Sequence, residues 1–218
     1  MNAGETISFV LICGHPRSSA AEYSSSFAAQ CQLRYYPIKR STYNVDLRSL
    51  LTKRFYFMNR FLEDFRSTVA NGKARLLAIP ADDARLGEPG HWSPKQIVGH
   101  LIDSAANNHQ RFVRAQSTHD LICPGYDQEA WVTTQKYNDE PWADLVQLWA
   151  SYNLHLAHVI SVMPEETLTR IRTEHNLDQI AWTAVDKTSP TTLEYFIRDY
   201  AGHMRHHLSQ ILGEDPTP

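Results

Sequence analysis

Two histidines near the C-terminus, His203 and His207, have the type and spacing that can hold a metal ion. Imidazole nitrogens one helical turn apart can converge on a single ion. On a helical projection of ~100° per residue, both rings fall in the middle of the apolar face that Phe196 and Tyr200 define. The pair is also compatible with two hydrogen-bonded core histidines. However, burial of two imidazoles is costly unless both are satisfied, and a shared ion would satisfy them together.

The best third ligand is His100, which lies between Ile97 and Leu101 on the inward side of an earlier amphipathic segment. Three histidine ligands that leave coordination positions open are typical of a reactive metal site, whereas structural zinc sites have four protein ligands. An ion held this way would lower the pKa of a nearby water or thiol. We therefore predict a metal site of His100, His203 and His207.

A polar line continues from His100 through Asp103, Asn107 and Arg111, at spacings of three, four and four residues. Asp103 is our candidate for proton transfer or for orienting a ligand, and a plain surface carboxylate is an equal alternative. Asn107 and Arg111 could bind a polar or anionic group of a substrate. The alternative interpretation is that this line is a solvated edge of the helix.

Two other side chains lie close to the predicted site. His155 borders the apolar face of its helix and either lines a substrate pocket or is a satisfied core histidine. Asp199, four residues before His203, could accept a hydrogen bond from that ring, but an ordinary helix-surface acid is the simpler interpretation. The other seven of the eleven histidines are expected to have no role in the site.

Four long amphipathic segments must position these residues. Ser93, Pro94 and Gln96 form an S-x-x-Q capping box with proline at the first helical position, and Thr191 with Glu194 gives a second box. The predicted helices cover 58–77, 93–117, 141–163 and 191–213, with a short helix at 128–135 and a long connection over 164–190. Four helices with one apolar face each bury best as a bundle, so the expected fold class is all-α.

The first 57 residues differ from the rest of the 218-residue chain, because no helical or strand period persists through their Ser-rich stretches. We expect 1–57 to be a poorly ordered N-terminal arm or the product of a misplaced start, since periodicity begins at Met58. The working domain is then 58–213, followed by a tail at 214–218.

Composition excludes several classes of protein. The net charge of −3, without a basic patch interleaved with aromatic residues, argues against nucleic-acid binding. No stretch approaches the ~20 apolar residues of a membrane span. The three cysteines form no CxxC pair, which favours a reduced, cytoplasmic location over a disulfide framework.

The segments 92–103 (WSPKQIVGHLID) and 202–210 (GHMRHHLSQ) together resemble the helix signatures of the DinB-like superfamily, especially its YfiT-like metal-dependent hydrolases. The resemblance covers about 58–213. It implies a four-helix bundle of up-down-down-up topology, often dimeric, with zinc or nickel held by the matching His100, His203 and His207. Some members of that family act as transferases or isomerases with low-molecular-weight thiols.

The expected function is therefore that of a metal-dependent enzyme acting on a small molecule, either a hydrolase or a low-molecular-weight-thiol S-transferase. The expected cofactors are a divalent metal and, for transfer chemistry, the thiol. The alternatives are a bundle that binds metal without catalysis and a metal-free bundle that only dimerises.

Overall fold

The structure is a computed structural model that describes the backbone of residues 47–213 and the side chains of 58–213. Among these residues it is helical, with two isolated bridges, Leu121 to His175 and Arg172 to Thr191, and no longer strands. The long helices are α1 (Leu47–Leu77), α2 (Pro94–Arg114), α4 (Trp142–Ser161) and α7 (Leu193–Leu212). The short ones are η1 (Asp83–Arg85), α3 (Gln128–Gln135), η2 (Tyr137–Asp139), α5 (Glu165–Thr169) and α6 (Leu177–Ile180). No helix of the described part is long and apolar enough to cross a membrane.

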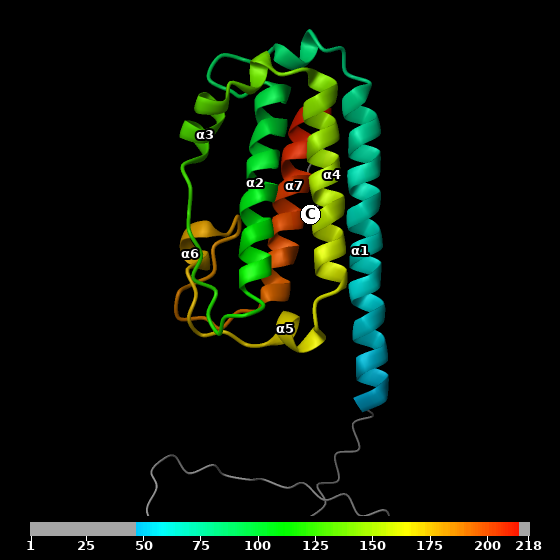
Figure 1. Cartoon of the computed structure of the whole chain (residues 1–218), viewed down its shortest axis with the longest axis vertical. Helices are drawn as coiled ribbons and strands as arrows, with labels where there is room; N and C mark the ends of the chain where they lie inside the picture. Colours follow the sequence, from blue (N-terminus) through cyan, green and yellow to red (C-terminus); the bar gives the residue numbers. More distant parts are fainter. Residues whose placement is uncertain (1–46, 214–218) are drawn as a thin grey trace, which may run out of the picture. The chain divides into compact units, whose positions relative to one another are not determined.

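The four long helices form a bundle in which α1 and α7 run one way and α2 and α4 run the other (Figure 1). Because α2 and α4 are parallel, the chain between them must return along the whole bundle, and this return contains α3 and η2. A second connection, containing α5 and α6, joins α4 to α7. The predicted all-α fold with up-down-down-up topology is confirmed.

The first helix is longer than predicted, because α1 begins at Leu47 instead of Met58. The chain contains neither glycine nor proline between Pro37 and Gly72, so nothing breaks the helix at the position where apolar periodicity begins. The expected boundary at 57/58 thus falls inside a helix. Residues 1–46 of the expected arm and the tail at 214–218 lie outside the described part of the chain.

Caps fix the ends of the two helices that contain the predicted ligands. The Ser93 side chain accepts a hydrogen bond from the Gln96 backbone N–H, and the Gln96 side-chain oxygen accepts one from the Ser93 backbone N–H, as predicted. For α7 the predicted cap was one residue early. Thr192 is the N-cap, whereas Thr191 pairs with Arg172 in a bridge, and Gly213 ends the helix with a φ of +64°.

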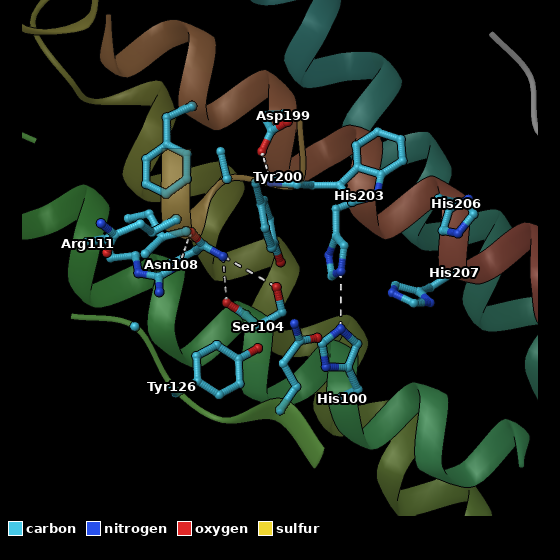
Figure 2. Close-up of a pocket in the computed structure, with 17 residues that line it drawn as sticks. His100, Ser104, Asn108, Arg111, Tyr126, Asp199, Tyr200, His203, His206 and His207 are labelled. Atoms are coloured by element: carbon cyan, nitrogen blue, oxygen red, sulfur yellow. Dashed lines mark hydrogen bonds between the residues drawn. The ribbon is translucent and has the colours of Figure 1, made fainter. Parts of the chain in front are cut away.

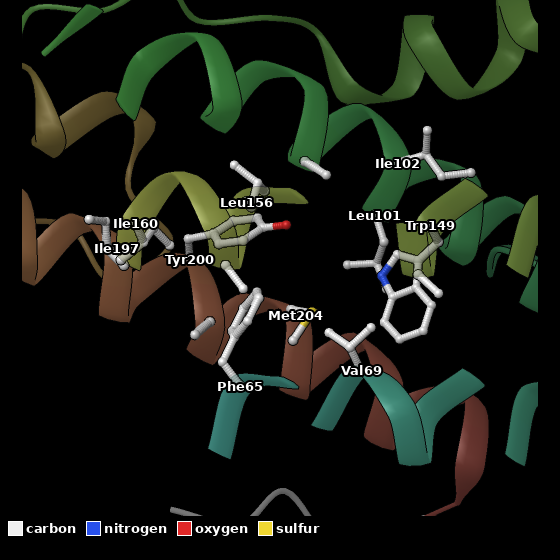
Figure 3. Close-up of a cluster of buried hydrophobic side chains, with 14 of the residues drawn as sticks. Phe65, Val69, Leu101, Ile102, Trp149, Leu156, Ile160, Ile197, Tyr200 and Met204 are labelled. Atoms are coloured by element: carbon white, nitrogen blue, oxygen red, sulfur yellow. The ribbon is translucent and has the colours of Figure 1, made fainter. Parts of the chain in front are cut away.

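The core lies between the four long helices, and Phe65, Leu101, Trp149 and Met204 meet there (Figure 3). The helical spacing of Leu145, Leu148, Tyr152 and Leu156 predicts that Leu148 lies on the buried face of α4. The observed face is rotated from this one, because Leu148 is 49% exposed while neighbouring Trp149 is fully buried. Gly72 of α1 makes room for this ring, since a Cβ there would lie 2.9 Å from the Trp149 side chain. The large indole, rather than the leucine period, therefore sets the phase of α4.

We expect Gly99→Ala to lower the free energy of unfolding, because a Cβ at Gly99 would lie 2.0 Å from the Tyr137 ring. Overpacking of this kind costs about 1–3 kcal/mol, and part of it is offset by the better helix propensity of alanine. Gly125→Ala is the control, because its nearest neighbour would be Ile180 at 3.8 Å. Urea unfolding of both variants checks this, and equal stability of the two would contradict the packing argument.

Candidate metal centre

Three histidines from two helices meet at the α2–α7 interface (Figure 2). One nitrogen of each of His100, His203 and His207 lies within 4.8 Å of the others. His100 is 1% exposed, and the other two are partly exposed. The rings pack edge to face, with centroids 4.5–5.1 Å apart. The predicted convergence of the three residues is therefore present in the structure.

The donor atoms fit a divalent ion. The Nε2 atoms of His100 and His203 are 3.1 Å apart, close to the ~3.3 Å that tetrahedral zinc geometry with ~2.05 Å bonds would require. The Nδ1 of His207 lies 2.7 Å from Oε1 of Gln210, an acceptor that places the ring proton there and leaves Nε2 free to bind a metal. Such partners orient metal-binding histidines, so this donor set is suited to a cation.

Burial keeps these imidazoles neutral, which is the form that binds metal. Desolvation, with the charge of His207, lowers the pKa of His100 to about 4. Desolvation and the neighbouring rings lower the pKa of His203 to about 2. The pKa of His207 is also lowered by burial, although the bond to Gln210 opposes the shift.

The triad opens into a cavity of about 360 Å³ between α2, α7 and the connecting segments. Its wall is partly aromatic, with Tyr126, Trp182, Phe196 and Tyr200 among the lining residues. Burial and the Asp103 carboxylate raise the pKa of Tyr126 to about 12, so its hydroxyl is a donor at neutral pH. His207, but neither His100 nor His203, also borders a second cavity of about 740 Å³.

The residues of the predicted polar line do not all reach the first cavity. Arg111 lines it, together with Ser104 and Asn108 of the same helix. Asp103 is 3% exposed and does not line it. Its Oδ1 accepts hydrogen bonds from Tyr137 and Gln135 at 2.7 and 2.8 Å. The predicted roles of Asp103 and Arg111 in the reaction stay predictions.

Asn107 and His155 lie away from the triad. Asn107 donates to the Asp103 backbone carbonyl and borders a different cavity, between α2 and the loop that follows it. His155 is exposed on α4, and its ring packs against His109 with centroids 5.0 Å apart. Neither residue lines the cavity that opens from the triad, and their binding roles also stay predictions.

Asp199 has a structural partner that the sequence did not indicate. Its two oxygens accept the backbone N–H groups of Trp182 and Thr183, each at 2.8 Å, and this fixes the 181–183 segment against α7. The Trp182 ring then packs over His206 and His203, with centroids 5.5 and 6.4 Å away. A Cβ at Gly202 would lie 3.0 Å from this ring, so the glycine permits the approach.

Sequence reasoning missed Tyr126 and Trp182, because both lie on connecting segments without a period. One usable pattern was present: Gly99 directly precedes His100, and Gly202 directly precedes His203. In both places an aromatic ring, Tyr137 or Trp182, occupies the space above the glycine. A glycine inside an amphipathic helix often marks such a close approach.

The family model described as the DinB superfamily matches residues 36–211. This chain belongs to the DinB superfamily. The matched range begins before Met58, in agreement with the earlier start of α1. A search of curated proteins found no match to this DinB protein.

Among solved structures, the DinB chain is similar to YfiT from Bacillus subtilis, with a TM-score of 0.58 and 17% sequence identity. The similarity covers 83% of this chain and 95% of YfiT. YfiT is described as a probable metal-dependent hydrolase with an unusual four-helix bundle topology. At this identity the likeness shows the shared fold of the two proteins.

Alanine substitution of any one of His100, His203 and His207 should lower the affinity for a divalent metal by at least ~10–100-fold, the loss typical when only a hydrogen-bond partner of a ligand is removed. His206→Ala is the matched control, because His206 lies on the same helix but outside the triad. Metal content after dialysis against a weak chelator is the measurement. Equal retention by His206→Ala and His203→Ala would contradict the assignment.

The metal-free protein should lose stability as the pH falls from 6.5 towards 4. Over this range the unfolded histidines take up protons, while folded His100, with a pKa of about 4, and His203, with a pKa of about 2, stay neutral. Stability is therefore full above pH 6.5 and declines below it. Urea midpoints of chelated protein measure the slope, which should be shallower in His203→Ala. Identical slopes would refute this explanation.

Proposed function

We propose that this DinB protein is a metal-dependent enzyme that acts on a small molecule. One observation supports this above others: three buried or partly buried imidazoles face a cavity. Among the described residues, no fourth candidate ligand joins this group. Such a donor set leaves coordination positions open, as in catalytic sites. Zinc and nickel both suit imidazole ligands, so either is a candidate.

A divalent ion at this site supplies Lewis acidity and lowers the pKa of a water or a thiol. The chain's own side chains would do the rest. Trp182 and Tyr200 limit access of bulk water, while Tyr126 and Ser104 offer hydroxyls that can orient a polar group of the substrate. We propose Asp103 as a residue for proton transfer or for orienting a ligand through its neighbours Gln135 and Tyr137.

Two reaction classes fit this site, hydrolysis and S-transfer from a low-molecular-weight thiol. The presence of His207 in the walls of two separate cavities favours transfer, because two reactants could approach the triad from different sides. In hydrolysis only one organic molecule is needed, and the second cavity would admit water. The proposed cofactors are accordingly the metal, with the thiol as co-substrate.

The proposed dimer follows from the family resemblance, and the proposed location from the cysteine pattern. We propose a homodimer in the cytoplasm, without a nucleic-acid or membrane partner. Sedimentation velocity of the purified full chain would measure the oligomeric state, and a single monomeric species would contradict the dimer.

The enzyme proposal predicts activity that depends on the metal and on His207. Protein loaded with zinc or nickel is assayed with activated esters for hydrolysis, and with an alkyl halide plus a cysteine-derived thiol for S-transfer. Chelation or His207→Ala should reduce turnover by at least ~100-fold, since the loss removes the Lewis acid. His158→Ala, at an exposed position of α4 that does not line the cavity, should leave turnover nearly unchanged. A cobalt-substituted protein with four protein ligands and no exchangeable position, and with no turnover, would support a non-catalytic metal-binding bundle.

A further inference from the structure

A buried cation lies in the wall of the same cavity as the triad but farther along α2. Arg111 is 6% exposed and lines the cavity with Asn108 and Phe196. Its guanidinium carbon is 5.9 Å from the centre of the Phe196 ring. A charge removed from water in this way is costly unless it is paired and hydrogen-bonded.

The protein itself uses few of the donors of Arg111. A guanidinium has five N–H groups. One donates to the Pro124 carbonyl at 2.8 Å, and another reaches Asn108 Oδ1 at 3.4 Å, beyond the usual range of a good bond. The Nε is buried and without a partner. Among the described residues, no carboxylate forms an ion pair with Arg111.

Arg172 shows how this chain satisfies a buried guanidinium that has only a structural role. It is 1% exposed and donates to three backbone carbonyls, those of Ala115, Thr118 and Asp120, at 2.8–2.9 Å. It lines none of the cavities described here. The Nε of Arg172 is without a partner, as is that of Arg111. Arg111 differs in making one good hydrogen bond instead of three and in having an open space beside it.

We propose that the substrate of this site is a small, elongated monocarboxylate, whose carboxylate pairs with Arg111 while its reacting group lies at the histidine triad. This inference rests on the proposed function and specifies its substrate class. A guanidinium binds a planar carboxylate through two parallel N–H bonds. The spare N–H groups of Arg111 supply such a pair.

Apart from the charge of a bound ion, the side chains that line the cavity favour one negative charge over two. Of the lining residues within the described part of the chain, only Arg111 has a permanent positive charge, and Asp199 lines the same cavity with a negative one. Both Asp199 oxygens already accept backbone N–H groups, so this carboxylate stays in place and would repel a dianion. A phosphate monoester is thus disfavoured relative to a carboxylate.

The separation of the two backbone positions on α2 sets the approximate length scale of the ligand. His100 and Arg111 are eleven residues apart on α2, which corresponds to ~16 Å along the helix axis at ~1.5 Å per residue. The cavity of about 360 Å³ admits a slender molecule of that length but not a bulky one. The aromatic rings of Phe196 and Tyr200, on the α7 side, would contact its apolar middle part.

The test uses zinc-loaded full-length protein and alkyl hydroxamates, which bind metal at one end, with either a carboxylate or a neutral primary amide at the other. The number of methylene groups is varied, and affinity is measured by calorimetry. We expect the carboxylate probes of best length to bind ~10–100-fold more tightly than the matched amides, as a charge-assisted pair allows. Equal affinities of acid and amide at every length would overturn the proposal.

Variants locate the effect and separate it from the metal site. Arg111→Gln should abolish the preference for acid over amide, and Arg111→Lys, which keeps the charge and is the safer variant for folding, should weaken it. Arg114→Gln is the matched control, because Arg114 lies one turn away, outside this cavity. Acetohydroxamate, which carries no second group, reports the metal site alone. If it fails to bind, the proposed function fails; if it binds and the acid preference survives Arg111→Gln, only this inference fails.

Discussion

Neutral histidines buried between two helices are the constraint on which the rest of this structure depends. Desolvation favours the neutral form of the imidazoles. Their burial costs free energy, and this cost is offset only where each ring has a hydrogen-bond partner or binds an ion. The rings come from α2 and α7, far apart in sequence, so their meeting requires both helices to be fixed in register and rotation. The Ser93 capping box and the Thr192 and Gly213 caps set where these helices begin and end. The caps of α2 and α7 thus help to set the positions at which the histidines meet.

Glycines next to two of the three histidines allow aromatic rings to pack closely around the site. A glycine precedes His100 on α2, and another precedes His203 on α7, and each is covered by an aromatic ring, Tyr137 or Trp182. A carboxylate holds each of these aromatic residues in place. The Tyr137 hydroxyl donates to Asp103, and the Trp182 backbone N–H donates to Asp199. Helix–ring–carboxylate units on both sides of the triad therefore limit how far the imidazoles can move.

Helix phase was enough to predict which three histidines converge, because α2 and α7 each have a strong apolar period and the histidines interrupt it on the inner side. Their role as metal ligands stays a prediction. The same method failed on α4, where Leu148 matched the period but the larger Trp149 took the interior and rotated the helix. The cap at Thr191 was one residue early, because the bridge to Arg172 is a tertiary contact that local sequence does not reveal. Loop residues of the cavity, such as Trp182, had no period to mark them. Their positions depend on long-range hydrogen bonds.

Membership of a superfamily fixes the bundle and leaves the chemistry to the side chains that face the cavity. In this protein the cavity has two poles of different character. At one pole, three imidazoles would hold an exchangeable cation. At the other, Arg111 is a permanent positive charge that is buried at a cost in free energy and has no carboxylate partner among the described residues. A hydrolase that handled neutral substrates would gain nothing from this second pole, and an apolar residue at 111 would be more stable. The unpaired guanidinium is thus better explained by what the site binds than by how the bundle folds.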